Sequence, residues 1–286
     1  MSFRLSLART TFQFRLRSSA FDFGLPRRTP IPPSPTHSTH STPSSTPSST
    51  SAASMSSTTS PRTPPTPPTA PAETPRGALI VLEGLDRSGK STQCERLVGH
   101  LKATGRKAEL MRFPDRTTTI GTMINSYLSN ATDIDDGCIH LLFSANRWEK
   151  KKEMEAKLRE GVSLIVDRYA FSGVAFTAAK RVAGMGREWC KGCDVGLLAP
   201  DVVLFLSLSA EEQEKRGDFG GERYEKREFQ ARVREEFEGL EKEYTGLWEK
   251  IDASGTMEEV FEALKERVEA IVENVATGGD GIRSLW

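Results

Sequence analysis

The sequence predicts an α/β domain in which helices cover both faces of a parallel β-sheet. Five apolar stretches of strand length occur between residues 78 and 253, and segments with helical periodicity separate them. A glycine-rich loop, GLDRSGKS at 84–91, directly follows the first apolar stretch. Strands that alternate with helices are typical of a parallel, doubly wound sheet, so this alternation decides the fold class.

The first half of the folded part is expected to hold two strands and three helices. ALIVLEG, at 78–84, is an apolar run that indicates a buried parallel strand, and the helix after the glycine-rich loop is expected to end at Gly105. AELMRF, at 108–113, is the second strand, because Pro114 cannot donate a hydrogen bond to a ladder. The three helices are expected at about 91–104, 118–130 and 136–160.

The second half continues the alternation with three more strands. VSLIVDR at 162–168, DVVLFLSL at 201–208 and residues 248–253 are the expected strands. GDFGGERYE, at 217–225, is glycine-rich, charged and without periodicity, which predicts a mobile loop. Apolar residues spaced by three and four predict a long helix after that loop. The helices of this half are expected at about 171–182, 209–216, 229–247 and 260–275.

The beginning of the chain has a different composition from the rest. Of 286 residues with a formal net charge of zero, residues 1–75 hold seven arginines, no lysine and fourteen of the 16 prolines. Residues 29–75 are a near-repeat of Ser, Thr and Pro, which cannot bury enough apolar surface to fold. We therefore expect a disordered extension at 1–75 and one folded domain at 76–286, since about 210 residues suit an α/β domain.

The first 28 residues have the composition of a targeting signal. They combine Arg and Ser with scattered Phe and Leu and hold one acid, Asp22, as a mitochondrial transit peptide does. An uncleaved extension is the alternative, and Met55 offers a second start without the basic segment. We expect a form in the cytoplasm and nucleus and, if residues 1–54 are a cleaved signal, a mitochondrial form. No apolar run approaches the roughly 20 residues that cross a bilayer, and neither a membrane nor a nucleic acid is expected as a partner.

Four cysteines are too few for a disulfide framework in a chain of this length. Cys190 and Cys193 have the C-x-x-C spacing of zinc and redox sites. No second Cys or His pair stands nearby in the sequence, and no predicted strand leads into them as a redox motif requires. Ordinary reduced thiols are therefore expected.

The loop at 84–91 matches the phosphate-binding pattern G-x-x-x-x-G-K-[ST] and lies between a predicted strand and a predicted helix. Backbone N–H groups of such a loop bind phosphates. Lys90 is expected at the β- and γ-phosphates, and the Ser91 hydroxyl is expected at Mg²⁺. A structural glycine turn is the alternative. The residues expected around a nucleoside triphosphate are Gly84, Leu85, Asp86, Arg87, Ser88, Gly89, Lys90, Ser91 and Thr92.

An Asp-Arg pair follows or ends three successive strands: Asp86-Arg87, Asp115-Arg116 and Asp167-Arg168. The carboxyl ends of parallel strands share one edge of the sheet, where ligands bind. A single pair is usually a surface ion pair, but three such pairs around a phosphate loop indicate several phosphates, which arginine binds through its rigid fork. Because the triphosphate already has the loop, a lysine and Mg²⁺, the sequence predicts a second phosphorylated substrate and hence a kinase acting on a monophosphate.

The three arginines are expected to contact different phosphate groups. Arg87 lies in the loop and can reach the γ-phosphate as it transfers. Arg116 and Arg168 are placed to hold the acceptor phosphate. Asp167 ends an apolar strand and is the expected partner of the Mg²⁺ water shell. Arg87, Lys90 and Asp167 are thus the expected catalytic residues.

The region from about residue 76 to 285 resembles eukaryotic thymidylate kinases, members of the P-loop nucleoside monophosphate kinase family. The resemblance rests on LEGLDRSGKSTQ, RFPDR, HLLFSANRWE, VDRYAFSGVAFT, PDVVLFL and ERYE. It implies a P-loop NTPase three-layer sandwich with a five-stranded parallel sheet and a mobile lid. It also implies ATP-dependent phosphorylation of dTMP to dTDP with Mg²⁺, a step of dTTP biosynthesis, in a homodimer.

The resemblance also assigns residues to dTMP. Asp86 is implied near the 3′-hydroxyl, Phe143 as a stacking partner of thymine and Arg147 as a donor to its carbonyl edge. Phe143 and Arg147 are one helical turn apart, so one helix face presents both; taken alone, they would be a core residue and a surface charge. The other residues implied around dTMP are Phe113, Arg116, Arg168, Tyr169, Ser172, Gly173, Phe176, Tyr224 and Gln230. Arg216 and the turn at 252–254 are implied near adenine.

Other functions stay open at this point. Another nucleoside monophosphate kinase or a deoxynucleoside kinase is the main alternative, although the latter needs no arginines for an acceptor phosphate. A GTP-dependent switch would carry Asn-Lys-x-Asp, which is absent from the sequence. An inactive scaffold would have no reason to keep Arg87, Lys90, Ser91 and Asp167. Acceptance of dUMP is not decided.

Overall fold

A computed structural model describes residues 75–216, 221–278 and 281–286. The predictions for the extension at 1–74 and for residues 217–220 of the expected lid lie outside these described residues. Within them, no helix combines the length and the apolar composition that a bilayer crossing requires.

The five predicted strands form one sheet, and all pairings are parallel. The order across the sheet is β2-β3-β1-β4-β5, so β1 lies at the centre and β2 at an edge. The strands are β1 Leu79–Gly84, β2 Ala108–Arg112, β3 Ser163–Asp167, β4 Val202–Ser207 and β5 Trp248–Asp252. The chain reverses its direction of strand addition after β3, so the carboxyl ends of β1, β2 and β3 lie beside the position where α/β sheets bind ligands.

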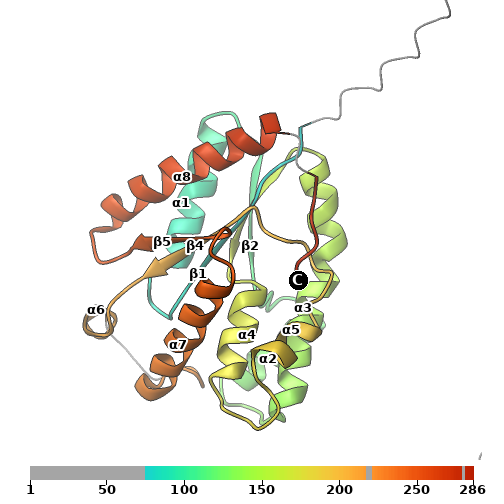
Figure 1. Cartoon of the computed structure of the whole chain (residues 1–286), viewed down its shortest axis with the longest axis vertical. Helices are drawn as coiled ribbons and strands as arrows, with labels where there is room; N and C mark the ends of the chain where they lie inside the picture. The colour runs from blue at the N-terminus through green and yellow to red at the C-terminus, as the bar shows by residue number, and fades with distance from the viewer. Residues whose placement is uncertain (1–74, 217–220, 279–280) are drawn as a thin grey trace, which may run out of the picture. The chain divides into compact units, whose positions relative to one another are not determined.

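Helices cover both faces of the sheet. They are α1 Lys90–Ala103, α2 Thr119–Leu128, α3 Asp136–Arg159, α4 Ala170–Ala178, α5 Arg187–Gly192, α6 Ala210–Lys215, α7 Arg227–Glu243 and α8 Met257–Gly278. In Figure 1, α1 and α8 lie on one side of the strands, and α3, α4 and α7 lie on the other. The three-layer α/β prediction is therefore confirmed.

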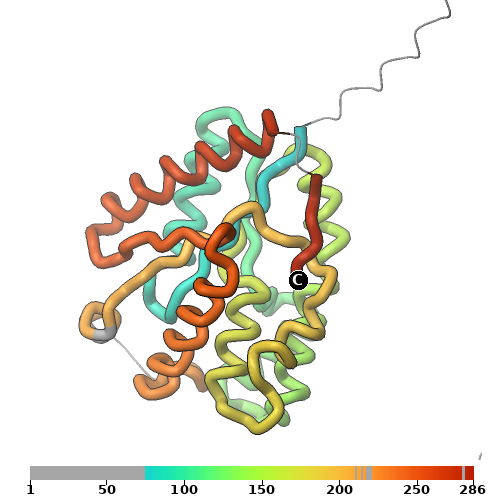
Figure 2. The backbone as a smooth tube through the Cα atoms, in the orientation of Figure 1, coloured from blue at the N-terminus to red at the C-terminus, as the bar shows by residue number. Residues whose placement is uncertain are grey.

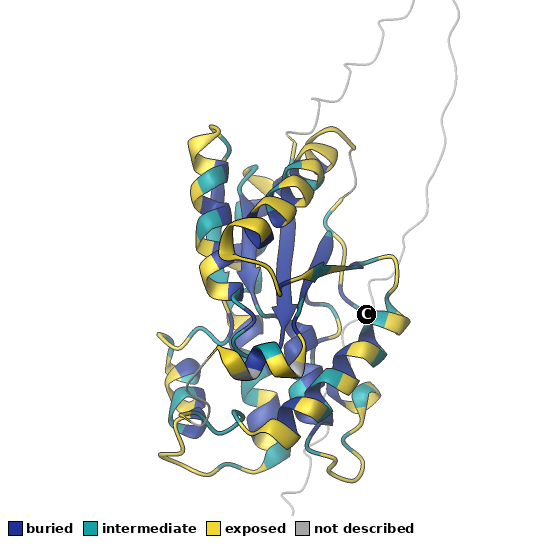
Figure 3. Cartoon of the chain, turned by 90° about the vertical axis from the view of Figure 1, so that its left-hand side faces the viewer, coloured by how far each residue is buried: buried dark blue, intermediate teal, exposed yellow. Residues whose placement is uncertain are grey.

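The alternation of strand side chains supplies both halves of the core. Ile80 and Leu82 of β1 pack with α1 and α8, whereas Leu79 and Val81 pack with α3, α4 and α7. The inner strands β1, β3 and β4 are buried almost throughout, and the helices turn their exposed sides outward (Figure 3). A strand buried on both faces needs a continuous apolar run, which is why ALIVL could be recognised in the sequence.

Two helical segments differ from the prediction. The helix expected to reach residue 182 stops at Ala178, because Arg181 adopts a positive φ of 60° that an α-helix cannot contain. Helix α5 was not predicted, since its six residues are too short to show a period. The other boundaries agree with prediction to within a few residues.

The end of the chain packs back onto the domain. Ser284 forms an antiparallel bridge with Leu198, and Leu285 is buried. Trp286 donates from Nε1 to the Lys191 carbonyl (2.9 Å), and its ring meets Phe171 edge to face. Figure 2 shows this last segment running beside the stretch between α5 and β4, and backbone hydrogen bonds join the two.

Candidate active site

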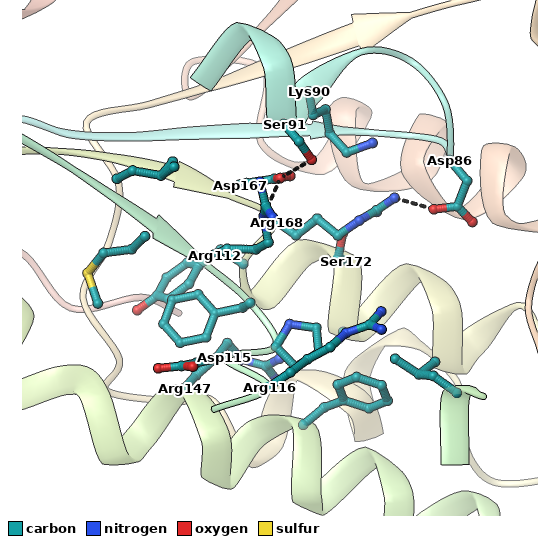
Figure 4. A pocket seen from close by; sticks show the side chains of 18 of the residues that line it. Asp86, Lys90, Ser91, Arg112, Asp115, Arg116, Arg147, Asp167, Arg168 and Ser172 are labelled. Carbon is teal, nitrogen blue, oxygen red and sulfur yellow. Dashed lines mark hydrogen bonds and ion pairs between the residues drawn. The ribbon is translucent and has the colours of Figure 1, made fainter. Parts of the chain in front are cut away.

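A cavity of about 1030 Å³ opens at the carboxyl ends of β1, β2 and β3. All three Asp-Arg pairs line it, as the position of the strand ends predicts. Figure 4 shows Lys90, Ser91 and Asp167 on one side of this cavity and Arg116 and Arg147 on another. Guanidinium groups from neighbouring strand ends thus meet in one space large enough for two ligands.

Most of the predicted site residues line the same cavity. They are Asp86, Arg87, Gly89, Lys90, Ser91, Thr92, Phe113, Arg116, Phe143, Arg147, Asp167, Arg168, Tyr169, Ser172, Gly173, Phe176 and Tyr224. Five predicted residues are not among the lining residues: Gly84, Leu85, Ser88, Arg216 and Gln230. Gly84, Leu85, Ser88 and Gln230 are buried, and Arg216 is exposed outside the cavity.

The phosphate loop needs its glycines for steric reasons. A Cβ on Gly84 would lie 2.7 Å from the Leu206 carbonyl oxygen and 3.0 Å from Ser88 Oγ. Gly89 has a φ of 90° and caps α1 without a side-chain acceptor. A phosphate oxygen is the acceptor that such a helix N-terminus attracts, through its N–H groups and its partial positive charge.

The ammonium group of Lys90 lies within the phosphate loop. Its ammonium donates to the Leu85 carbonyl (2.6 Å) and to Ser88 Oγ (3.2 Å). Burial, with a smaller contribution from the nearby charge of Arg168, lowers the pKa of Lys90 to about 8. A bound phosphate would favour the charged form, so the lysine is placed to gain a strong interaction when a nucleotide arrives.

Asp167 gathers the groups expected at a metal ion. Ser91 Oγ donates to Asp167 Oδ2 (2.6 Å), and Arg112 Nε donates to the same oxygen (3.0 Å). A hydroxyl and a carboxylate are oxygen donors, the kind that Mg²⁺ prefers, so these residues fit that ion. Among the described residues no three His, Cys, Asp or Glu side chains form a metal cluster. Mg²⁺ keeps several waters and binds substrate phosphates, so it needs few protein ligands.

Arg168 reaches across the cavity from the end of β3. Its guanidinium donates to the Gly84 carbonyl (3.1 Å), to Ser172 Oγ (3.1 Å) and to Asp86 Oδ1 (2.5 Å). The other oxygen of Asp86 accepts from Gln230 Nε2 (2.7 Å). Two of the three predicted Asp-Arg motifs are therefore joined by a cross-pair, because the aspartate of the first binds the arginine of the third.

The sequence reasoning missed Glu83, which fixes the backbone that follows Arg168. Glu83 is fully buried and accepts from Tyr169 N (2.9 Å), Ser172 N (3.0 Å) and Ser172 Oγ (2.5 Å). It therefore caps the start of α4 from a distant strand. Burial raises the pKa of Glu83, whereas the Ser172 bond and the charge of Arg168 act in the opposite direction. A lone acid within an apolar strand was the available signal.

Arg116 and Arg87 both contact acids of the segment 221–225. The two terminal nitrogens of Arg116 lie 2.8 and 3.1 Å from the carboxylate oxygens of Glu222. Arg87 reaches Glu225 at 3.5 Å. Arg116 is 43% exposed, so an incoming phosphate can displace its carboxylate partner at little cost.

Asn146 is a second residue that the sequence reasoning missed. Its Oδ1 accepts from Asp115 N (2.7 Å), and its Nδ2 donates to the Asp115 carbonyl (3.2 Å). Asn146 is buried on α3, so the helix that presents Arg147 also fixes the loop that presents Arg116.

Aromatic side chains form the other end of the cavity. Phe143 and Arg147 project from α3, as the helical spacing predicts. The ring centroids of Phe113 and Tyr169 are 5.6 Å apart, and Phe176 lies 5.6 Å from Tyr224. This end offers flat apolar surfaces beside the guanidinium of Arg147, which suits a neutral heterocycle, and the Arg168 guanidinium lies 5.2 Å from the Phe176 ring.

Two further arginines have contacts away from the cavity. Arg216 donates to the Ala253 carbonyl (2.5 Å) and lies 3.5 Å from the Arg87 carbonyl. It thus links the phosphate loop to the turn after β5. Arg223 donates to Tyr127 O, Thr132 O and Asp133 Oδ1 and does not line the cavity.

The cysteines carry no sign of redox chemistry. All four are free thiols. Burial raises the pKa of Cys190 to about 12 and raises the pKa of Cys193 as well. A thiol that keeps its proton is a poor nucleophile, which agrees with the expectation of ordinary reduced cysteines.

A parallel sheet with a phosphate loop between β1 and α1, and an arginine-lined cavity beside it, define a P-loop nucleotide kinase. Residues 82–264 match the family model described as thymidylate kinase. The chain belongs to the thymidylate kinase family.

Named relatives agree with this assignment. Thymidylate kinase of Arabidopsis thaliana is 53% identical over 74% of this chain and 78% of its own. The enzyme of Homo sapiens is 54% identical over 66% of this chain and 89% of its own. A solved structure of thymidylate kinase from Candida albicans superposes with a TM-score of 0.67 at 37% identity and covers 74% of this chain and 99% of that one.

Proposed function

We propose that this protein transfers the γ-phosphoryl group of ATP to dTMP and forms dTDP. The single observation that carries the proposal is the meeting of Arg87, Arg116 and Arg168 in one cavity with the phosphate loop. A triphosphate alone does not need three arginines. A second phosphate ester beside it does, because each guanidinium compensates charge that accumulates as two anions approach.

The chain's residues divide into a donor side and an acceptor side. The phosphate loop, the start of α1 and Lys90 bind the triphosphate, and Arg216 lies near the expected adenine position. Ser91 and, through water, Asp167 would hold Mg²⁺, which supplies charge compensation between the β- and γ-phosphates when bound. Arg116 and Arg168 bind the phosphate of dTMP, and Asp86 lies near its 3′-hydroxyl.

The transfer itself needs no covalent intermediate with the protein. An oxygen of the dTMP phosphate attacks the γ-phosphorus, the bond from that phosphorus to the β-bridging oxygen breaks, and ADP leaves. The protein contributes alignment and positive charge, as is general for phosphoryl transfer. Arg87 supports the migrating group from within the loop.

A coupled assay of ADP release with each nucleoside monophosphate tests the substrate. We expect dTMP to be the best acceptor and activity to disappear when EDTA removes Mg²⁺. The solved Candida albicans relative is described as having broad substrate specificity, so dUMP, dCMP and dGMP belong in the panel. A preference for another monophosphate would show that dTMP is not the substrate. Activity with nucleosides would show that the acceptor carries no phosphate, against the role given to Arg116 and Arg168.

Arg147→Ala tests how the base is read. Loss of the guanidinium is expected to cost about 1–3 kcal/mol of the preference for dTMP over dCMP, because a buried donor to the base edge is removed. The ratio of kcat/KM for the two acceptors measures this preference. An unchanged ratio would show that Arg147 does not contact the base.

We also infer a homodimer, formed by the face that α3 shares with the segment 189–195. Four large apolar side chains are exposed there: Leu141 (52%), Trp148 (38%), Trp189 (43%) and Val195 (55%). Single exposed apolar residues are common, but a group of this size marks an association surface. Sedimentation velocity is expected to show a dimer that Leu141→Glu with Trp148→Glu converts to a monomer. Met257→Glu, at an equally exposed site on α8, is the control.

We infer that the enzyme acts in the cytoplasm and nucleus, with a mitochondrial form directed by the basic residues 1–28. Microscopy of two fluorescent fusions, one of the full chain and one of a chain that starts at Met55, tests this. The full chain is expected in mitochondria and the shorter chain in the cytoplasm and nucleus. Identical diffuse signals would remove the mitochondrial form.

A further inference from the structure

Arg147 is held by an ion pair of a different kind from those of the other cavity arginines. Its Nε donates to Asp194 Oδ1 (3.2 Å), and one terminal nitrogen donates to Asp194 Oδ2 (2.6 Å). Arg147 is 2% exposed and Asp194 is fully buried. Arg116, in contrast, pairs with a carboxylate that is 40% exposed. The pair of Arg147 is thus a fixed part of the structure, whereas the partner of Arg116 is replaceable.

The guanidinium of Arg147 is confined from the opposite direction by α4. A Cβ on Gly173 would lie 2.9 and 3.0 Å from its two terminal nitrogens and 3.2 Å from Cζ. The side chain therefore lies against the backbone of α4 while Asp194 holds it from the other direction. An arginine otherwise loses about 1.5–2 kcal/mol of rotamer entropy when it becomes ordered, and here that cost is met during folding, before any substrate binds.

Asp194 is itself fixed by its neighbours. Ser144 Oγ donates to Asp194 Oδ1 (2.7 Å), and Asp194 N donates to the Lys191 carbonyl (2.9 Å). The residues that follow pair with the end of the chain, since Gly196 N donates to Leu285 O (3.1 Å) and Leu285 N donates to Leu197 O (2.6 Å). The C-terminal tail thus supports the loop that carries the carboxylate.

We propose that Asp194 is a positioning residue that orients Arg147 toward the base of the acceptor nucleotide and sets the affinity for that nucleotide. This inference rests on the proposed function. The bidentate pair uses Nε and one terminal nitrogen, which leaves the second terminal nitrogen outside the pair, and Arg147 lines the cavity. Asp194 also compensates the guanidinium charge, so that Arg147 donates to a neutral carbonyl and competes poorly with Arg116 and Arg168 for phosphate.

Asp194→Asn is the direct test, because it keeps the shape of the side chain and removes its charge. We expect KM for dTMP to rise about tenfold, with kcat and KM for ATP within about twofold of the wild-type values. A selective change in KM is the mark of lost ground-state binding, which a general loss of folded protein does not produce. An unchanged KM for dTMP would overturn the proposal.

A double-mutant cycle decides whether Asp194 acts through Arg147. In an Arg147→Ala background, Asp194→Asn is expected to change kcat/KM for dTMP by less than about twofold, since the group it orients is gone. Full additivity of the two substitutions would show that Asp194 acts by another route. If Asp194→Asn does not fold, Ser144→Ala replaces it in the cycle, with a smaller rise in KM expected in the same direction.

Asp201→Asn is the matched control. Asp201 accepts two bonds from Arg76 (2.9 and 2.7 Å) and its side chain is 10% exposed, but it does not line the cavity. It is expected to lower thermal stability and to leave KM for dTMP unchanged. If the wild-type protein does not phosphorylate dTMP, the proposed function fails. If it does and Asp194→Asn leaves KM for dTMP unchanged, the positioning role of Asp194 fails and the proposed function stands.

Discussion

Arg87→Ala is expected to lower kcat at least about 100-fold while KM for dTMP and for ATP changes little. Arginines that stabilise a migrating phosphoryl group contribute about 10³–10⁵ in rate in related enzymes, so 100-fold is a lower bound. Arg87 lies within the phosphate loop at a positive φ of 66°, a backbone conformation that costs a non-glycine residue about 1–3 kcal/mol. The fold keeps this strained position, and the guanidinium that it presents lines the cavity.

Single-turnover kinetics with saturating ATP and dTMP measure this effect, because they separate the chemical step from product release. Arg96→Ala is the control. Arg96 projects from α1 and pairs with Glu258 outside the cavity, so its loss is expected to leave kcat unchanged. Near-normal turnover of Arg87→Ala would refute the role of Arg87 in transfer.

Glu83→Ala is expected to reduce both stability and the use of dTMP. Its removal leaves three donors of the α4 start without their acceptor, and buried donors without partners cost about 1–3 kcal/mol each. We expect the free energy of unfolding to fall by about 3 kcal/mol or more. Arg168, which has a φ of 66°, depends on the same turn. Its displacement is expected to lower kcat/KM for dTMP by more than about tenfold beyond any loss of folded protein.

Chemical unfolding and steady-state kinetics on the same samples separate the two effects. Glu83→Gln is the matched variant, because its amide oxygen still accepts from both backbone N–H groups. It is expected to retain most of the stability that Glu83→Ala loses. If kcat/KM for dTMP follows only the folded fraction in both variants, Glu83 supports the fold and has no influence on Arg168.

Features whose residues are adjacent in the sequence were accessible without coordinates. The phosphate loop is eight consecutive residues, and each central strand is a continuous apolar run because both of its faces are buried. The gathering of three Asp-Arg pairs was also predictable, since all parallel strands end at one edge of the sheet. The position of Phe143 and Arg147 on one face of a helix also followed from their spacing in the sequence.

Contacts between residues that are far apart in the sequence could not be predicted from the sequence. Glu83 and Ser172 are 89 residues apart, and Arg147 and Asp194 are 47 apart. Nothing in the local sequence tells a buried acceptor which donor it will meet. Helix α5 was missed for the opposite reason, because its six residues carry too little local pattern.

The sequence alone determined that this chain has a P-loop α/β domain, where its phosphate-binding loop lies, and that arginines follow its strand ends. These features depend on local residue order and on the rule that parallel strands share one direction. Only the tertiary structure decided which carboxylate fixes which arginine: Asp86 for Arg168, Glu222 for Arg116 and Asp194 for Arg147. Packing between the layers selects those partners. A buried polar group must form a hydrogen bond, but its partner can come from any position in the sequence.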